Sequence, residues 1–584
     1  MLHKIRIKHF FYLYLLFALF TLLFDIGFTT HLGNIRVPFA GRYKFYYWSQ
    51  NWTIFLSAVL VLGLVNSRKI MDVFRRLDGT VPSLRVRVML FSLLVLLSLA
   101  VHYLVLMQMY LTDDESAYRF CAQVLAGGRL TAESFPHKEF FDRIFMINDG
   151  RFFPKYYYGW PFLLAAGECT GLPFLINSLF YAGSTFILYS LVKSFTSGLW
   201  GFTGALFFLL SPLALVGSAT FLSHSSTTFF FLLFMYCWRL VTAGQGKSDT
   251  ALLPLMAFSG GAMLLIRPFT AVLAAAPFIV ALVIRGFRTR FDYRGTIGFA
   301  GVGLLLCGLF LWLNFLLHGS VTGSGYSHYV NYSVSNDLVF SYWNPSPVPF
   351  KGAVPPAENS LGFKMAVAQF LCSFTRLGFD GVMVPVTLLF VAAVATGFRT
   401  GVEYLVSYLL VVAGYSWFDL GIDSFGPVHL SEAAPLGILF VVTFLYRGNT
   451  MINGFLQQGN LQTVFGGAAV AFALVACSSL CWLPIRLFNV HEMAAEISHP
   501  YVTARKNGIH NAVVFSSTPF IRRGRLRHFR FWRDNPSVNL DDDIIWVNDF
   551  TGRKNRELRK LFPDRTFYRM RWEGKTGPLH FDKM

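Results

Sequence analysis

The sequence predicts an all-α polytopic membrane protein that carries a small soluble α/β domain at its C-terminal end. Three observations lead to this fold class: 54% of the 584 residues are hydrophobic, only 14% are charged, and the mean hydropathy is +0.50. A typical soluble chain is about 25% charged. Lipid accommodates this much apolar surface, whereas a soluble fold could not hide it from water. Disordered, collagen-like and disulfide-stapled classes are excluded.

The basic residues follow the pattern of membrane topology. The net charge is +19, but many of the basic residues lie in short segments between apolar runs, as the positive-inside rule expects. Segment 68–87 holds six basic residues against two acidic ones. We therefore place this segment and the N-terminus in the cytoplasm, and we expect membrane lipids but no nucleic acid as partners.

Apolar runs predict about thirteen spans within residues 1–485. The run at 10–28 resembles a signal peptide, but its length and the absence of a small-residue cleavage site indicate an uncleaved first span. A second span ends near 65. The others are expected near 88–111, 173–193, 199–217, 222–240, 251–266, 269–285, 296–317, 380–398, 402–418, 432–446 and 462–483. With the N-terminus inside, this count places the C-terminus outside, and we expect the protein in the inner (plasma) membrane.

Two long loops, 112–158 and 318–379, then face the extracytoplasmic side, where loops of this length often carry function. Residues 486–584 turn polar and predict a soluble domain on the same side. Its strands are expected at 512–515, 544–547 and 566–571, and its helix at 555–561. An Arg-rich run at 522–533 is either a solvated strand or a surface for anionic lipid or glycan.

The strongest candidate for chemistry is the acidic motif Asp113-Asp114-Glu115, directly after the third span. Acidic side chains at a membrane edge are expensive unless they are solvated or used. Thr112 and Glu115 also fit a capping box, so the motif can simply start a helix. The two interpretations are compatible, because a helix start is a rigid mount for a carboxylate that accepts a proton.

A second motif runs from Gly150 to Pro161 and returns from the same outer loop into the membrane. Its cations Arg151 and Lys155 stand beside Tyr156 and Tyr157, a combination that suits a phosphate near the interface. The alternative is an aromatic belt with snorkelling cations.

Three further polar residues fall at predicted outer ends of spans: His224, Arg267 and His429. An Arg in a short apolar connection requires an anionic partner or backbone carbonyls. His429 and Glu432 could share a helix face and form a weak metal pair, and His224 could simply be interfacial. No phosphate-binding loop or dinucleotide motif is visible in the sequence.

The acidic motif and the later Gly150–Pro161 segment, in this order and in one outer loop, resemble the GT-C superfamily of integral-membrane glycosyltransferases. The nearest relatives are the protein O-mannosyltransferases and the aminoarabinose transferases of bacterial lipid A. The resemblance covers roughly residues 88–450. The segment Gly426-Pro427-Val428-His429 departs from the pattern of many relatives, which carry an aromatic residue or Arg there, and the C-terminal domain also differs.

The resemblance implies an inverting enzyme that moves a hexose or pentose from a polyprenyl-phosphate donor to an extracytoplasmic lipid, glycan or protein. Asp114 or Asp113 would be the general base, with Glu115 beside them. Lys155 would bind the donor phosphate, with Arg151 and Arg267 as weaker candidates. The candidate substrate-binding residues are Tyr156, Tyr157, His224 and His429.

Two other functions stay open at this point. A transporter or flippase for lipid-linked sugars would carry charges along its spans and inverted repeats. A non-catalytic subunit of an envelope-assembly complex would tolerate loss of the acidic residues. A divalent metal ion that assists at the acidic motif is also left open, although the sequence shows no ligand set for it. No resident cofactor is assigned from the sequence.

Overall fold

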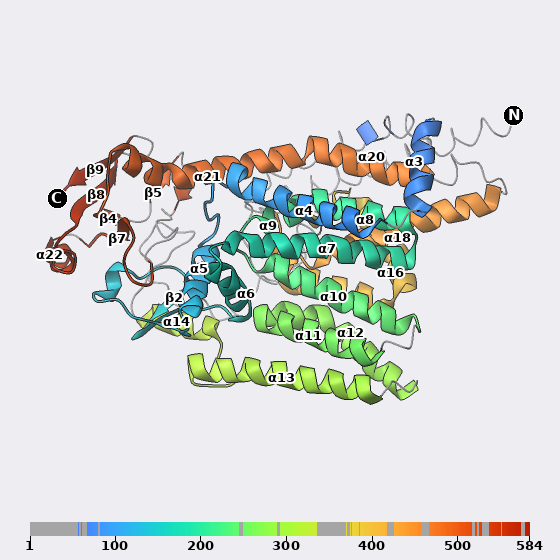
Figure 1. The fold of residues 1–584 in the computed structure, drawn as a ribbon, viewed down its shortest axis with the longest axis horizontal. Helices are drawn as coiled ribbons and strands as arrows, with labels where there is room; N and C mark the ends of the chain where they lie inside the picture. Colours follow the sequence, from blue (N-terminus) through green and yellow to red (C-terminus); the bar gives the residue numbers. More distant parts are fainter. Residues whose placement is uncertain are drawn as a thin grey trace.

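The computed structural model is mostly helical, with its helices side by side in one bundle and a small sheet domain beyond one end (Figure 1). The described residues are 56–57, 60, 67–79, 82–244, 249–288, 293–335, 370, 374, 376–384, 386–416, 426–456, 466–516, 520–522, 525–527, 537–550, 552–573 and 578–584. The predicted first span at 10–28, and most of the second, lie outside these residues.

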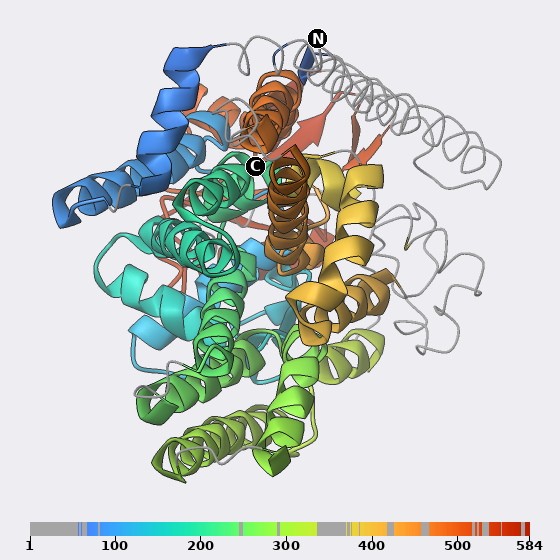
Figure 2. The ribbon, with the colours of Figure 1, turned by 90° about the vertical axis from the view of Figure 1, so that its right-hand side faces the viewer.

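Long apolar helices follow one another through the bundle. They are α4 (Leu84–Ala100) with the π-helical turn η1 (Val101–Val105), α7 (Pro173–Phe195), α8 (Gly198–Leu210), α9 (Pro212–Ser218), α10 (His224–Thr242), α11 (Asp249–Ile266), α12 (Pro268–Arg288), α13 (Tyr293–His318), α16 (Val386–Thr400), α17 (Val402–Ser416), α18 (Ala433–Leu456) and α20 (Gly466–Cys481). Each predicted span from 88–111 onward overlaps one of these helices or a bent pair, but the helix of the first ends at Val105 and that of 380–398 begins at Val386. In both views α13 lies at the edge of the bundle opposite to α20 (Figure 1, Figure 2).

Five helices of the described chain are long and apolar enough to cross a membrane, or six if the bent pair α8–α9 forms one span. The bend of 60° occurs where Pro212 follows Ser211, whose hydroxyl caps the amide of Ala214 at 3.3 Å. Proline at a helix start leaves the preceding helix without its next hydrogen bond. The multi-pass helical fold class is confirmed, and the number of spans stays a prediction.

The two ends of the bundle differ in character. Helix α3 (Arg68–Gly79) lies at one end, with Met71 and Phe74 buried and Lys69 and Arg75 exposed. Such an amphipathic basic helix suits an interface with lipid headgroups. Helix α5 (Asp113–Ala126), which begins with the acidic motif, lies at the other end (Figure 1). The assignment of the α3 end to the cytoplasm stays a prediction.

The predicted outer loop 112–158 is folded. After α5 come the 3-10 turn η2 and a small antiparallel sheet of order β1-β3-β2, and then the short helix α6 returns into the bundle. Part of the second outer loop forms α14 beside this sheet, and residues 336–369 lie outside the described chain. The bounds are β1 (Ala132–Glu133), η2 (Lys138–Phe140), β2 (Met146–Asn148), β3 (Arg151–Pro154), α6 (Gly159–Cys169) and α14 (Gly325–Ser335).

The C-terminal domain is an α/β unit at the end of α21 (Leu483–Lys506), which continues from α20. Its sheet has the order β7-β4-β8-β9, with β7 and β8 parallel to β4 and β9 antiparallel to β8. The elements are β4 (Ala512–Ser516), the hairpin β5 (Phe520–Arg522) and β6 (Arg525–Arg527), β7 (Ile544–Asn548), α22 (Gly552–Arg559), β8 (Thr566–Trp572) and β9 (Leu579–Lys583).

All three predicted strands and the helix of this domain are present, whereas β9 and the hairpin were not predicted. The hairpin carries part of the Arg-rich run, and the rest of that run is outside the described residues. The predicted domain boundary at 486 falls inside α21, so the division of the chain at that residue stays a prediction.

Candidate active site

The acidic motif starts α5 as the capping-box pattern predicts. The Glu115 carboxylate accepts the backbone amides of Leu111 at 2.8 Å and Thr112 at 3.1 Å, and its second oxygen accepts the amide of Phe221 at 2.9 Å. Glu115 is fully buried, as is Asp113. Glu115 therefore joins the start of α5 to the segment between α9 and α10, a structural task that occupies both of its oxygens.

Asp114 is the member of the motif that reaches the site surface. It is only partly buried, and it accepts a short hydrogen bond from the hydroxyl of Tyr156. The Tyr156 ring packs on Tyr118, with centroids 4.6 Å apart. The Tyr118 hydroxyl in turn lies 3.4 Å from that of Ser223 at the start of α10. Tyr156 of the returning segment thus holds the Asp114 carboxylate, and Tyr118 of α5 supports the Tyr156 ring.

Lys155 is held by aromatic rings. Its ammonium lies 3.6 Å from the centroid of Phe145, 4.9 Å from Tyr326, 5.2 Å from Tyr156 and 5.5 Å from Tyr329. Ring faces attract a cation but do not neutralise its charge. Burial lowers the pKa of Lys155 to about 8, against the opposing effect of the Asp114 charge. We call this arrangement of four rings the Lys155 cage.

Two glycines bring the backbone close enough to form this corner. A Cβ on Gly159 would lie 2.5 Å from the carbonyl carbon of Leu265, so α6 begins directly against the end of α11. A Cβ on Gly325 would collide with the carbonyl oxygen of Lys155, so α14 begins directly on the lysine. Glycine at both positions permits a separation that any larger residue would prevent.

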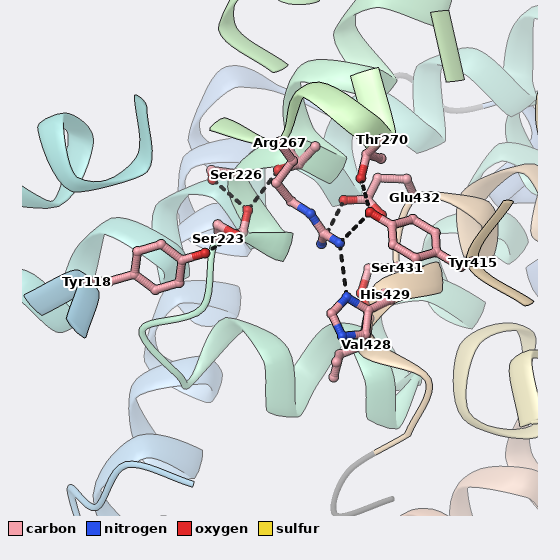
Figure 3. A network of polar contacts seen from close by, with 11 residues as sticks. Tyr118, Ser223, Ser226, Arg267, Thr270, Tyr415, Val428, His429, Ser431 and Glu432 are labelled. Carbon is pink, nitrogen blue, oxygen red and sulfur yellow. Dashed lines mark hydrogen bonds and ion pairs between the residues drawn. The ribbon is translucent and has the colours of Figure 1, made fainter. Parts of the chain in front are cut away.

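Arg267, in the connection between α11 and α12, is the second cation (Figure 3). One guanidinium nitrogen donates to the Tyr415 hydroxyl at 2.8 Å and to Nδ1 of His429 at 3.2 Å. The other lies 3.5 Å from the carboxylate of Glu432. The side chain of Arg267 is 11% exposed and that of Glu432 is fully buried. Tyr415 is further held by Thr270 at 2.5 Å.

The two candidate histidines lie against each other, with ring centroids 5.5 Å apart. Burial and the charges of Arg267 and Lys155 lower the pKa of His429 to about 3. His429 is therefore neutral at physiological pH and accepts a hydrogen bond from Arg267 through Nδ1. His224 is buried, and neither ring nitrogen has a hydrogen-bond partner among the residues that the structure describes. The predicted His429–Glu432 pair is thus bridged by Arg267.

These groups form one cluster drawn from distant parts of the chain. The Asp114 charge acts on Lys155, and both Lys155 and Arg267 act on His429. The cluster places one partly exposed carboxylate and two cations together at the end of an apolar bundle. Such a site can accept a proton on one side and stabilise a developing anion on the other.

Two of the predicted residues do not face this cluster directly. The Arg151 guanidinium donates to the carbonyls of Leu316 at 3.2 Å and Leu317 at 3.1 Å, near the end of α13. Carbonyls at a helix C-terminus attract cations, and this contact explains the position of Arg151. Tyr157 borders the cluster, with its ring 5.6 Å from Phe310 and 6.0 Å from Tyr326.

Four tyrosines around these groups, Tyr118, Tyr326, Tyr329 and Tyr415, were not among the predicted site residues. Tyr118 stands four residues after Asp114 on the same helix, and this spacing on one helix face could have indicated it. Tyr326 and Tyr415 come from α14 and α17, and no local pattern in the sequence links either to the acidic motif. No group of three His, Cys, Asp or Glu side chains within the described residues is arranged to hold a metal ion.

No protein-family model and no curated protein matches the sequence. Among solved structures, the chain is similar to ArnT from Cupriavidus metallidurans bound to undecaprenyl phosphate, at 11% identity over 82% of this chain and 92% of that one, with a TM-score of 0.45. It is also similar to the Archaeoglobus fulgidus oligosaccharyltransferase, at 10% identity over 83% and 69%, with a TM-score of 0.45. A third is the arabinofuranosyltransferase AftD from Mycobacteria, at 14% identity over 81% and 32%, with a TM-score of 0.38.

Proposed function

We propose that the protein is a membrane glycosyltransferase that moves a sugar from a polyprenyl-phosphate donor to an acceptor hydroxyl outside the cytoplasm. The observation that carries this proposal is the cluster of Asp114 with Lys155 and Arg267 at one end of an apolar bundle. A lipid-linked phosphate sits where its chain is in lipid and its headgroup is at the interface, which is the position of this cluster in a membrane-spanning bundle.

The transfer step assigns a role to each charged group. The acceptor oxygen attacks the anomeric carbon of the sugar and forms the new glycosidic bond, while Asp114 takes the proton of the acceptor hydroxyl. The bond between that carbon and the donor phosphate breaks, and the electron pair leaves with the polyprenyl phosphate. Lys155 and Arg267 stabilise the negative charge of this leaving group. A single displacement of this kind inverts the anomeric configuration.

The remaining polar residues support these three. Tyr156 orients Asp114, and Tyr415, His429 and Glu432 orient Arg267. His429 presents a neutral ring beside the guanidinium, so it adds no charge that would compete with the phosphate. Glu115 positions the acidic motif and takes no part in the reaction, because backbone amides occupy both of its oxygens.

A transfer assay in lipid tests the proposal. The full-length protein is given labelled polyprenyl-phosphate hexoses and pentoses together with a crude envelope fraction of lipids, glycans and proteins as acceptors. Asp114→Asn should lower transfer by roughly 10²–10⁴-fold, the usual contribution of a general base. Asp72→Asn is the matched control, because Asp72 is exposed on α3 at the other end of the bundle.

The outcomes are distinct. Transfer by the wild type and by Asp72→Asn but not by Asp114→Asn supports both the reaction and the base, and the labelled product names the sugar and the acceptor. Transfer that survives in Asp114→Asn contradicts the assignment of the base. Absence of both transfer and saturable donor binding, with every sugar offered, contradicts the proposed function.

A further inference from the structure

The C-terminal domain contacts the first predicted outer loop through the side chain of Asn548, at the carboxyl end of β7. Its amide nitrogen donates to the carbonyl oxygens of Glu139 at 3.2 Å and Asp142 at 3.0 Å. A side-chain amide has two N–H donors, so both are used across this interface. Asn548 thus binds the backbone at two residues of a segment that is distant in the chain.

An aromatic contact accompanies these hydrogen bonds. The ring of Phe140, between the two carbonyls in sequence, is 1% exposed. It lies 6.2 Å from Phe515 of β4 and 5.1 Å from Phe550, which follows β7. At the rim, Lys554 of α22 lies 3.9 Å from Glu139. The interface therefore has a buried apolar centre and a polar edge, as specific protein contacts do.

The same loop continues to the Lys155 cage. The Asp142 carboxylate accepts hydrogen bonds from the Asn148 amide at 2.9 Å and from the Tyr332 hydroxyl at 2.8 Å. Tyr332 lies on α14, the helix that supplies Tyr326 and Tyr329 to the cage. Three successive hydrogen-bonded residues thus lead from the C-terminal domain to the helix that covers the lysine.

A stiff connection fixes the domain relative to the bundle. Its stalk, α21, continues from α20 and is held by a buried ion pair between Arg486 and Asp380 at 2.8 Å. Further along, His491 contacts the carbonyl of Val105 at 3.1 Å. The sheet domain, β2 and α14 gather at the same end of the molecule in Figure 1. The contacts of α21 with the bundle therefore fix the position of the domain independently of its contacts with the loop.

We propose that the C-terminal domain is a positioning element of the active site, with Asn548, Asp142 and Tyr332 as the residues that keep α14 closed over Lys155. The inference rests on the proposed function in one respect: that function makes Lys155 a ligand of the donor phosphate. These three residues lie outside the cluster of Asp114, Lys155 and Arg267, and they act on it by holding α14 over Lys155.

The reactivity of Lys155 toward an amine-acylating ester measures this directly. The full-length protein in lipid is labelled briefly over a range of pH, and mass spectrometry reports the rate at Lys155 with exposed Lys193 of α7 as the internal reference. Asn548→Asp replaces two donors with an acceptor that faces two carbonyls. It should raise the maximal labelling rate of Lys155 roughly five- to tenfold, the effect of losing hydrogen bonds of ordinary strength.

A pH readout separates positioning from general loosening. The midpoint of Lys155 labelling should lie near the value of about 8 set by the closed cage, and in Asn548→Asp it should move upward because an opened cage restores hydration. Asn539→Asp makes the same charge change at an exposed position of the same domain and should leave both rate and midpoint unchanged. Tyr332→Phe breaks the second link from outside the domain and should act in the same direction.

An unchanged rate and midpoint at Lys155 in both Asn548→Asp and Tyr332→Phe overturns the inference, as does an equal effect of Asn539→Asp. Tyr332→Phe keeps the test decisive if Asn548→Asp unfolds the domain. The labelling uses no sugar and no lipid donor, so failure of the proposed glycosyl transfer leaves its result intact.

Discussion

Lys155 and Arg267 are the two cations of the cluster, and the protein holds them in opposite ways. Arg267 has three polar partners, including a carboxylate, within 3.5 Å. Lys155 is surrounded by four aromatic rings, and the Asp114 charge acts on it from further away. Arg267 is held by hydrogen bonds and an ion pair, whereas Lys155 is held by cation–π contacts.

Arg267 therefore carries a permanent charge, whereas the charge of Lys155 depends on its surroundings and on pH. Guanidinium remains protonated at any physiological pH and binds in a fixed planar geometry, whereas an ammonium changes its pKa with its surroundings. An arriving phosphate would replace ring contacts at Lys155 without displacing a carboxylate. At Arg267 it would join a network that already fixes the guanidinium. We expect changes at Arg267 to affect stability as well as binding, and changes at Lys155 to affect binding alone.

The largest effect should follow Arg267→Ala. It leaves the fully buried carboxylate of Glu432 without its cation, and loss of one partner of a buried pair costs about 3–5 kcal/mol of stability. Thermal unfolding in lipid measures this loss. Arg267→Ala combined with Glu432→Gln should recover much of the stability but not donor binding. Arg85→Ala, at an exposed position of α4, is the control, and equal stability of Arg267→Ala and wild type would contradict the anchoring role.

A smaller and pH-dependent effect should appear at Lys155. The ammonium is the form that would bind the proposed donor phosphate, and its pKa is lowered to about 8. On that proposal, affinity for polyprenyl phosphate should be full below that pH. Above it, affinity should fall, by at most about tenfold per pH unit. Lys155→Arg keeps its charge, so its binding should be flat between about pH 7 and pH 9.5. A wild-type curve as flat as that of Lys155→Arg would refute the titration of Lys155.

The smallest effect should come from Tyr415→Phe. The ring keeps its stacking on His429, at 5.4 Å between centroids, while the hydroxyl that accepts from Arg267 at 2.8 Å is lost. One hydrogen bond of this kind contributes about 1 kcal/mol, or roughly fivefold in donor affinity. Tyr446→Phe, on α18, supplies the matched control by titration calorimetry. An affinity equal to wild type would show that Arg267 is held without the tyrosine.

The acidic motif illustrates both the reach and the limit of inference from sequence. Its position after a span and its capping-box spacing predicted the start of α5, and both are present. The three carboxylates look alike in sequence, yet Asp113 and Glu115 are buried and Asp114 is the one partly exposed. The decision depends on Phe221 and Tyr156, which reach the motif from 106 and 42 residues away.

Arg151 and Lys155 teach the same lesson in the returning segment. Both are cations beside tyrosines, and both were candidates for the donor phosphate. Arg151 lies against the last carbonyls of α13, whereas the ammonium of Lys155 lies within the cage. Four residues of separation place the two side chains in different surroundings because β3 ends at Pro154, directly before Lys155.

The sequence by itself determined the helical membrane fold, the positions of most of the apolar helices and three strands of the C-terminal domain. These features follow from composition and local periodicity, which act over a few residues. Only the tertiary structure decided which carboxylate is exposed, which cation is caged and how the C-terminal domain meets the first outer loop. Those outcomes depend on contacts between segments far apart in the chain, such as Asn548 with Asp142, and no local pattern encodes them.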